Sequence, residues 1–326
     1  MTRTLALALT LVASPALADV PNALTTHLLP GFHAFSTAST ALAASARQDC
    51  RAEAVQPAYQ AAFDAWMAVG DLRIGPSEQG ALSIAFWPDD RGFTGRTLSR
   101  MIAASDPAVN DPATFAEVSI AARGFFALDM LLYDPAFAYE PGSYPCTLVQ
   151  AVAEDLAAQA EALETTWAGK FTEALTNPGA PDNALYLTEE EALRAVYTQL
   201  LAGLEMTADS RLGRPMGSFE RPRPRLAEAW RSGRSLRNVV LSVEAAQALA
   251  HALADWDLPQ TDAAVAQVHF AAGNIDDGSF QDVTDAVHRL HLEALQQAVR
   301  AVRAALEIEI GERLGIAPGF NSQDGD

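Results

Sequence analysis

The segment RGFFALDMLLYD, residues Arg123–Asp134, is apolar at most positions and carries one carboxylate, Asp129, near its middle. On a helix that turns about 100° per residue, Phe126 and Tyr133 lie on the same side as Asp129, and the opposite side is apolar too. A helix that is apolar all round is buried. The segment therefore predicts a central helix of a helical bundle, within residues 112–134.

The rest of the chain shows the same helical spacing. Ala and Leu are abundant, Val and Ile are sparse, and apolar residues recur at intervals of three and four. Asp111 before Pro112 is typical of a helix start, and Thr188 with Glu191 forms a capping box. We therefore predict an all-α protein with helices over residues 21–47, 51–70, 112–134, 146–170, 188–210, 234–256 and 280–311.

The turn-rich segment TNPGAPDN, residues Thr176–Asn183, predicts a linker between two parts of the chain. In both parts an Arg/Gly/Pro-rich link follows a long helix, at DLRIGPSEQG and at SRLGRPMGSFE. Each part has enough helix for a four-helix bundle. We predict two four-helix-bundle-like halves, residues 19–176 and 184–326.

The N-terminus has the pattern of a secretory signal peptide. Arg3 precedes the apolar run Leu5–Val12, and the small-residue stretch Ala16–Ala18 offers a cleavage site before Asp19. No later segment reaches the ~18 uninterrupted apolar residues that a membrane-spanning helix needs. We predict a signal peptide over residues 1–18 and a periplasmic protein that does not span the membrane.

The charge of the chain bounds its partners. The formal net charge is -19, and loss of Arg3 would make it -20. Such acidity argues against nucleic acid as a partner.

The two cysteines, Cys50 and Cys146, are an even pair in a chain expected to enter an oxidising compartment, so they predict a disulfide.

The carboxylate of Asp129 needs a partner if its helix is buried. A bare carboxylate in an apolar interior is costly unless it is paired, hydrogen-bonded, protonated or bound to a metal ion. Two interpretations remain open: a structural acid that ties one helix to another, with Arg73 as a candidate partner, or an acid that serves a ligand or metal site.

The segment from Arg211 to Arg237 holds eight Arg and two acids, Glu220 and Glu228, a net charge of +6 (8 − 2) in an acidic protein. Guanidinium groups suit carboxylate and phosphate partners. Internal salt bridges between the halves and an anionic ligand between them are the two interpretations of this segment. The candidate anion contacts are Arg231, Arg234 and Arg237.

Four segments carry a family resemblance: DLRIGPSEQGALSIAFWPDDRG at Asp71–Gly92, RGFFALDMLLYD, AWRSGRSLRN at Ala229–Asn238, and the C-terminal LGIAPGFNSQDGD. In this order and spacing they resemble the imelysin-like family of exported, all-helical proteins with two bundled halves. Some members are assigned to a peptidase family and others are tied to iron uptake. The resemblance implies the same fold and a connection with iron acquisition.

The best-known motif of that family, Gly-x-His-x-x-Glu, is proposed to bind metal and falls here on Gly124, Phe126 and Asp129. Phe offers no lone pair in place of His, and Asp is shorter than Glu, so a transition metal would lose its nitrogen ligand. Asp129 remains the one candidate metal ligand, for iron or another divalent cation. The altered motif argues against peptidase activity.

The favoured interpretation is a non-enzymatic binding or accessory protein of an iron-uptake system, which takes a metal ion or an anionic chelate and works with an envelope protein. A metal-dependent peptidase and an envelope scaffold without a ligand are the alternatives. Trp87 and Pro88 are expected to line the same ligand-binding cleft as Arg73 and Glu78. The predicted ligand-binding residues are Arg73, Glu78, Arg123, Phe126, Asp129, Arg231, Arg234 and Arg237.

One further cluster, Asp285, His288 and His291, has a spacing of three along the last long helix and fits either a surface metal site or a solvated helix face. The sequence has no HExxH motif and no G-x-S-x-G motif, so the usual zinc-peptidase and serine-hydrolase signatures are absent from it.

Overall fold

A computed structural model describes residues 18–319 of the chain. Within that range every regular element is a helix, and Ser218 and Arg221 form an isolated β-bridge. No helix among these residues is long and apolar enough to cross a membrane. The all-α prediction is confirmed. The predicted signal peptide lies outside the described residues, apart from Ala18.

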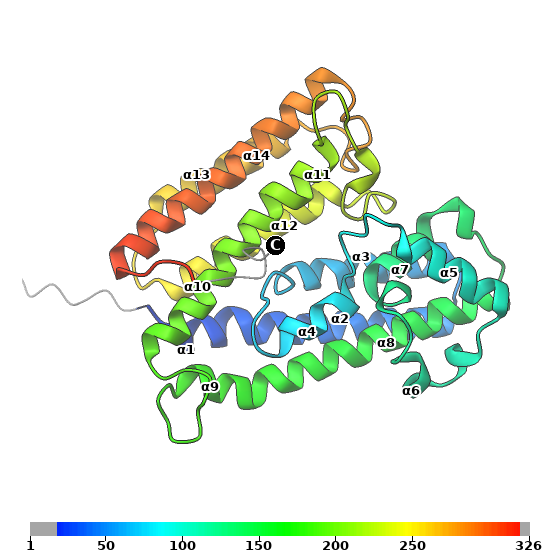
Figure 1. Ribbon diagram of the computed structural model, residues 1–326, viewed down its shortest axis with the longest axis horizontal. Helices are drawn as coiled ribbons and strands as arrows, with labels where there is room; N and C mark the ends of the chain where they lie inside the picture. Colours follow the sequence, from blue (N-terminus) through cyan, green and yellow to red (C-terminus); the bar gives the residue numbers. More distant parts are fainter. Residues whose placement is uncertain (1–17, 320–326) are drawn as a thin grey trace, which may run out of the picture.

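Four helices of the N-terminal part pack together (Figure 1), and aromatic side chains meet between them. They are α2 (Leu29–Gln48), α3 (Ala52–Met67), α7 (Gly124–Tyr133) and α8 (Tyr144–Thr166). α2 lies between α3 and α8, and α7 contacts both α3 and α8. The rings of Phe63 from α3 and Phe125 from α7 stack at 4.2 Å between centroids. The short helix α7 is thus held against α3 and α8.

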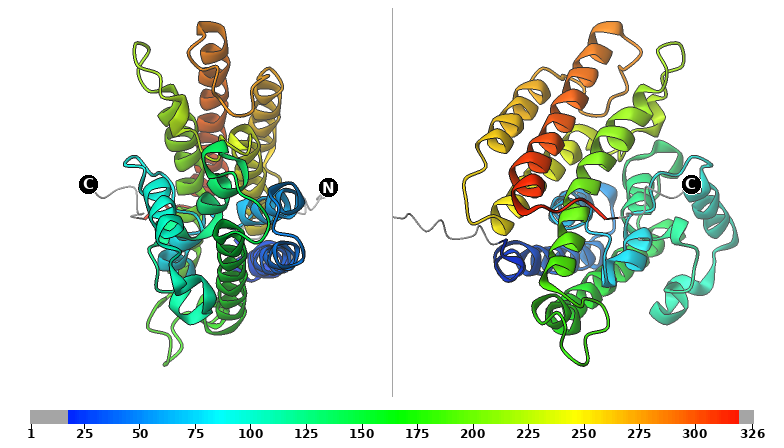
Figure 2. Two further views of the ribbon diagram at one scale, coloured as in Figure 1. Left: turned by 90° about the vertical axis from the view of Figure 1, so that its right-hand side faces the viewer. Right: turned by 60° about the vertical axis from the view of Figure 1, so that its left-hand side comes forward.

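Four helices of the C-terminal part form a second group (Figure 2). They are α10 (Glu189–Glu205), α12 (Ser235–Leu253), α13 (Pro259–Ala272) and α14 (Ala286–Leu306). α13 runs beside α14, and α10 contacts both α12 and α14. A π-helical segment, Met206–Leu212, extends α10 toward the Arg-rich part of the chain.

The two groups are joined along α12. The first helix, α1 (Val20–Ala23), packs on α12, and so does α3. A single cluster of buried apolar side chains runs from Val20 to Ile316 through both groups. A continuous core does not show where one half of the chain ends and the next begins. The predicted division into halves at residues 19–176 and 184–326 therefore stays a prediction.

The predicted helices near residues 21–47, 51–70, 146–170, 188–210, 234–256 and 280–311 are present, with shifted ends. Several shorter helices were not predicted from the sequence: α4 (Pro76–Ile84), α5 (Phe93–Ala104), α9 (Thr172–Thr176), α11 (Gly213–Met216) and α13. Pro259 occupies the first turn of α13, where its missing N–H costs nothing.

The continuous helix predicted over residues 112–134 is wrong. The chain forms α6 (Pro112–Phe115), a 3₁₀ turn at Ile120–Ala122 and then α7, which begins at Gly124. Gly124 has φ of +68°, and a Cβ atom there would lie 2.1 Å from the carbonyl oxygen of Ile84. The chain needs a glycine at this position, because it turns sharply against the end of α4.

The predicted disulfide between Cys50 and Cys146 is confirmed. It joins the loop after α2 to the first turn of α8, with 5.5 Å between the two Cα atoms. The bridge closes a loop of 96 residues that contains α3, α4, α5 and α7. It therefore fixes the ends of the segment that carries Asp129.

Candidate functional site

Asp129 lies in the interior, as its sequence context predicts. Its side chain, from the middle of α7, is 1% exposed. The Oδ1 atom accepts a hydrogen bond from the backbone N–H of Ser232 at 3.1 Å and a longer one from the hydroxyl of Tyr59 at 3.4 Å. Two neutral donors, one from α3 and one from the loop before α12, thus hold this acid.

Burial raises the pKa of the Asp129 carboxyl to about 6. The hydrogen bonds from Ser232 and the nearby charge of Arg231 act in the opposite direction but do not outweigh the loss of solvation. Arg231 is itself paired, since its Nε donates to Oδ2 of Asp134 at 2.7 Å. Asp129 therefore loses its proton near pH 6, and not near pH 4 as an exposed aspartate does.

A cavity of about 510 Å³ opens beside Asp129, and we call it the Asp129 pocket. Its walls come from the link before α5, from α5 and α7, and from the loop before α12. The lining includes aromatic rings, carboxylates and guanidinium groups: Trp87, Asp89, Asp90, Thr94, Arg96, Phe126, Asp129, Met130, Arg225, Trp230 and Arg231. The predicted site residues Phe126, Asp129 and Arg231 are thus brought together.

The segment Ala229–Gly233 forms one wall of the Asp129 pocket. Both of its ends have positive φ, +46° at Ala229 and +69° at Gly233. Between them, Arg231 contacts Asp134, the residue after α7, and Ser232 contacts Asp129 of α7. This segment therefore couples the N-terminal helices to α12 at the pocket wall.

The other predicted site residues lie away from the Asp129 pocket. Arg123 forms a two-bond salt bridge with Asp155 at 2.7 and 2.9 Å, and Glu78 is exposed in the first turn of α4. The expected pairing of Arg73 with Asp129 is not what the structure shows. Arg73 lies two residues after Asp71. Burial holds the pKa of its guanidinium below its usual value, and the charge of Asp71 opposes this effect without reversing it.

Arg234 and Arg237 both bind Asp64. Arg234 is buried and donates from Nη2 to Oδ1 of Asp64 at 2.7 Å, and Arg237 donates from Nε to the same oxygen at 2.7 Å. The guanidinium of Arg234 also lies 4.7 Å from the ring centre of Phe63. These contacts join α12 to α3, so they match the internal salt bridges that were one of the two interpretations of the Arg-rich segment.

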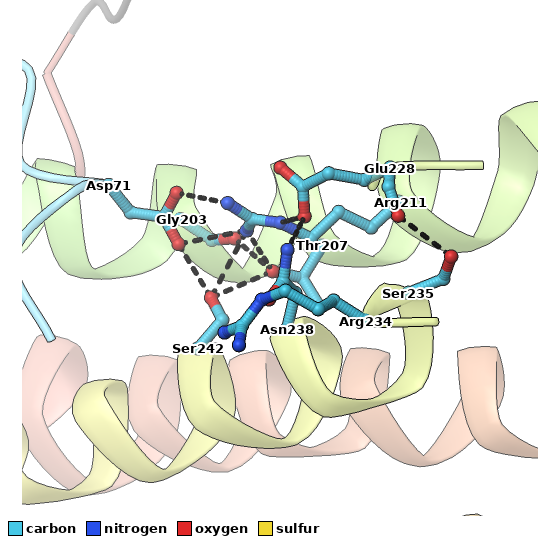
Figure 3. Close-up of polar contacts among 9 residues, drawn as sticks. All are labelled: Asp71, Gly203, Thr207, Arg211, Glu228, Arg234, Ser235, Asn238 and Ser242. Atoms are coloured by element: carbon cyan, nitrogen blue, oxygen red, sulfur yellow. Dashed lines mark hydrogen bonds and ion pairs between the residues drawn. The ribbon is translucent and has the colours of Figure 1, made fainter. Parts of the chain in front are cut away.

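A second buried polar cluster was not predicted from the sequence. Arg211 lies between the carboxylates of Asp71 and Glu228 (Figure 3). It donates two bonds of 2.9 Å to Asp71 and one of 2.8 Å to Glu228. Ser242 of α12 donates to Asp71 at 2.5 Å, and Asn238 donates to Glu228 at 3.0 Å. We call Asp71, Arg211 and Glu228 the buried triad.

The charges of the buried triad stabilise one another. Burial alone raises the pKa of Asp71, but the facing guanidinium of Arg211 outweighs it and holds that pKa below its usual value. Burial likewise lowers the pKa of Arg211, and the two carboxylates reverse this effect and raise it. Counting Arg73 beside Asp71, two cations face two anions, so this cluster ties the chain together and leaves no net charge for a ligand.

The cluster Asp285, His288 and His291 does not assemble as one site. Asp285 caps α14 by accepting from the backbone N–H of Val287 at 2.8 Å, while His288 contacts Asp282 at 2.7 Å. Among residues 18–319, no group of three or more His, Cys, Asp or Glu side chains is arranged to hold a metal ion.

The buried acid makes stability depend on pH in a defined direction. The pKa of Asp129 is higher in the folded chain, about 6, than its ordinary 3.8, so the favourable contribution is full below about pH 4 and is lost as pH rises through 6. In Asp129→Asn the amide oxygen keeps both hydrogen bonds and the charge is gone. We expect this variant to be more stable than the wild type by up to ~3 kcal/mol at pH 7.5 and equally stable at pH 4. Urea unfolding at the two pH values measures this, and a variant less stable at pH 7.5 would contradict it.

The sequence matches the family model Peptidase_M75: Imelysin over residues 27–306. The fold is similar to the crystal structure of an imelysin-like protein from Psychrobacter arcticum, with a TM-score of 0.74 and 17% identity over 93% of this chain and 99% of that one. It is also similar to a putative iron-regulated protein A precursor from Parabacteroides distasonis, with a TM-score of 0.72 and 14% identity over 91% and 96% of the two chains. No curated protein matches the sequence. Because the family match covers most of the chain, this protein belongs to the imelysin family.

Proposed function

We propose that this protein is an exported binding protein that takes an anionic metal chelate into the Asp129 pocket, in connection with iron acquisition. The observation that carries the proposal is the placement of a buried, poorly solvated carboxyl group beside a cavity that arginines also line. A pocket with a few polar groups on mainly apolar walls is the usual form of a small-molecule site. Iron would be part of the bound ligand and not a resident cofactor.

The residues around Asp129 do not fit a bare transition-metal ion. Phe126, where the family motif has His, offers no donor atom, and the nearby acids are already engaged. Asp89 accepts from the backbone N–H groups of Phe93 and Thr94, each at 2.8 Å, and Asp90 is paired with Arg214. One buried carboxylate gives too few ligands to hold a divalent ion.

The guanidinium groups of the pocket favour an anion that carries its own metal. Arg96, Arg225 and Arg231 line the cavity, and Arg presents a planar fork of donors that matches carboxylates. The link to iron rests on the family and on the structural neighbour, whose title calls it an iron-regulated protein A precursor. An envelope protein of an iron-uptake system would be the natural partner.

Two observations support export to the periplasm. A disulfide joins the two cysteines of the chain, and disulfides persist in oxidising compartments. Asp19, the residue after the proposed cleavage site, begins the fold: its carboxylate caps α1 at the N–H of Asn22, and its own N–H donates to the carbonyl of Leu253 at 2.9 Å. Cleavage before Asp19 would leave these contacts intact.

The export proposal predicts a defined N-terminus. Protein recovered from the periplasmic fraction is expected to begin at Asp19, as intact-mass measurement and N-terminal sequencing would show. A chain that keeps Met1 and is found with the cytoplasmic markers would contradict it.

The binding proposal predicts selective loss of chelate affinity. Ferric citrate is expected to bind the purified protein, and Arg231→Ala is expected to weaken that binding at least tenfold, about 1.4 kcal/mol, because it removes a guanidinium from the pocket wall. Isothermal titration calorimetry measures the affinity. Arg300→Ala is the matched control, since Arg300 is an exposed residue of α14 paired with Asp209. Equal affinity in wild type and Arg231→Ala would contradict the proposal.

The same titrations separate the alternatives. Absence of any heat with ferric citrate, citrate or free divalent ions would favour an envelope scaffold. Cleavage of denatured protein substrates that a chelator abolishes and Asp129→Ala removes would favour a peptidase.

A further inference from the structure

We propose that the Asp129 pocket selects a flat aromatic acid, an aryl carboxylate, with the ring against Phe126 and Trp87 and the carboxylate facing Asp129 and Arg231. This inference rests on the proposed function, because it names the ligand class of the same pocket. It concerns the organic part of the ligand, whether free or as the chelating group of a metal complex.

The walls of the pocket suit a planar apolar body. The rings of Trp87 and Phe126 are nearly parallel, with an interplanar angle of 20° and 6.5 Å between centroids, and both residues line the cavity. Met130 and Trp230 add further apolar surface. Phe126 is anchored from behind by Phe63, which meets it edge-on at 5.9 Å. Aromatic side chains held in this way offer ring faces for stacking, which an aliphatic ligand uses less well.

The polar end of the pocket suits a carboxylate. The backbone N–H of Ser232 and the hydroxyl of Tyr59 both donate to Oδ1 of Asp129 and fix the orientation of its carboxyl group at the pocket. Thr94, a lining residue that is 4% exposed, has a hydroxyl without a hydrogen-bond partner among the described residues. A protonated carboxyl, a hydroxyl and the guanidinium of Arg231 are all hydrogen-bond donors, and their common acceptor is an anionic oxygen pair.

The same groups disfavour a cationic ligand. A cation would need an ionised Asp129, yet the two other lining acids, Asp89 and Asp90, are occupied by backbone N–H groups and by Arg214. Arg96 and Arg225 would repel it. Among the lining groups without a salt bridge within residues 18–319, Arg96 and Arg225 are cations and Asp89 is an anion, so the remaining charge is positive when Asp129 is protonated.

Binding should depend on the protonation of Asp129. The titratable and charged groups that face this acid are Tyr59 on α3, Tyr133 on α7, and Arg231 and Arg234 before α12. Burial raises the pKa of both tyrosines above their usual value. Among these groups Asp129 alone titrates near pH 6.

Calorimetric titration with benzoate, cyclohexanecarboxylate, benzyl alcohol and ferric citrate tests the inference. Benzoate is expected to bind at least tenfold more tightly than cyclohexanecarboxylate, which has the charge without the flat ring, and than benzyl alcohol, which has the ring without the charge. The affinity for benzoate is expected to fall about tenfold between pH 5.5 and 7.5.

Variants of the two stacked aromatic residues show which side chains cause the preference for an aromatic acid. Phe126→Leu is expected to remove the preference for benzoate over cyclohexanecarboxylate, and Trp87→Leu gives a second readout if Phe126→Leu does not fold. Arg300→Ala should keep the preference. Equal binding of the two acids by the wild type, or an unchanged preference in a folded Phe126→Leu or Trp87→Leu variant, would overturn the inference.

Ferric citrate distinguishes this inference from the proposed function. If ferric citrate binds and benzoate does not, the aryl class is wrong and the proposed function stands. If neither binds, both are wrong.

Discussion

Replacement of Arg211 by Met is expected to lower the free energy of unfolding by about 3–5 kcal/mol. Arg211 is 5% exposed and is the shared partner of Asp71 and Glu228. Removing it leaves two carboxylates facing each other in a poorly solvated interior, which costs more than the pair of salt bridges contributes. Met keeps most of the side-chain volume, so the loss reports charge and not a cavity. Urea unfolding followed by circular dichroism measures it.

Two further variants show whether charge is the cause. Arg300→Met removes an exposed arginine paired with Asp209 and should change stability by less than about 1 kcal/mol. The double variant Arg211→Met, Glu228→Gln leaves Asp71 beside Arg73, one anion with one cation, and should regain most of the lost stability. If the double variant is no more stable than Arg211→Met, charge imbalance is not the cause of the loss.

Removal of the disulfide is the second change with a large expected effect. The bridge between Cys50 and Cys146 closes a loop of 96 residues, and the chain-entropy relation gives about 4–5 kcal/mol of stabilisation for a loop of that length. The variant Cys50→Ala, Cys146→Ala is therefore expected to unfold at a much lower urea concentration than the oxidised wild type.

Reduction offers the matched control for the disulfide. A reductant should destabilise the wild type to about the level of the double variant and leave the double variant unchanged, because both cysteines of the chain are in this bridge. A wild type with the same unfolding midpoint in its oxidised and reduced forms would contradict the expectation.

The fold class was predictable because it depends on local pattern. Long amphipathic stretches such as α2, α8 and α14 carry their own helical spacing, and the structure has helices there. The break before α7 was not predictable from spacing. It depends on the close approach of Gly124 to the carbonyl of Ile84, a contact between residues 40 positions apart that no periodicity records.

The candidate site, like the fold, was predictable from the sequence only in part. Burial of Asp129 follows from its apolar neighbours in the sequence, whereas the identity of its partners does not. Ser232 lies 103 residues away from Asp129. Arg231 reaches the pocket through a loop with positive φ at Ala229, a conformation that an alanine residue rarely adopts and that its sequence therefore does not suggest.

The buried triad was missed because its members are far apart in the chain. Asp71 and Arg211 are separated by 140 residues, and each lies in a Gly- and Pro-containing segment that was interpreted as a link. The available signal was the similarity of those two segments, since Asp71 opens the first and Arg211 stands near the start of the second. Their pairing requires the packing of α12 against both parts of the chain.

Binding of a metal chelate in the Asp129 pocket is best tested by locating iron in a crystal of the protein grown or soaked with ferric citrate. Anomalous diffraction at the iron edge locates the metal independently of the surrounding model of the ligand. We expect an iron peak inside the cavity lined by Asp129, Phe126 and Arg231, separated from the protein side chains by the chelating ligand. An iron peak elsewhere on the protein, or none in this cavity despite binding in solution, would show that the Asp129 pocket does not bind the chelate.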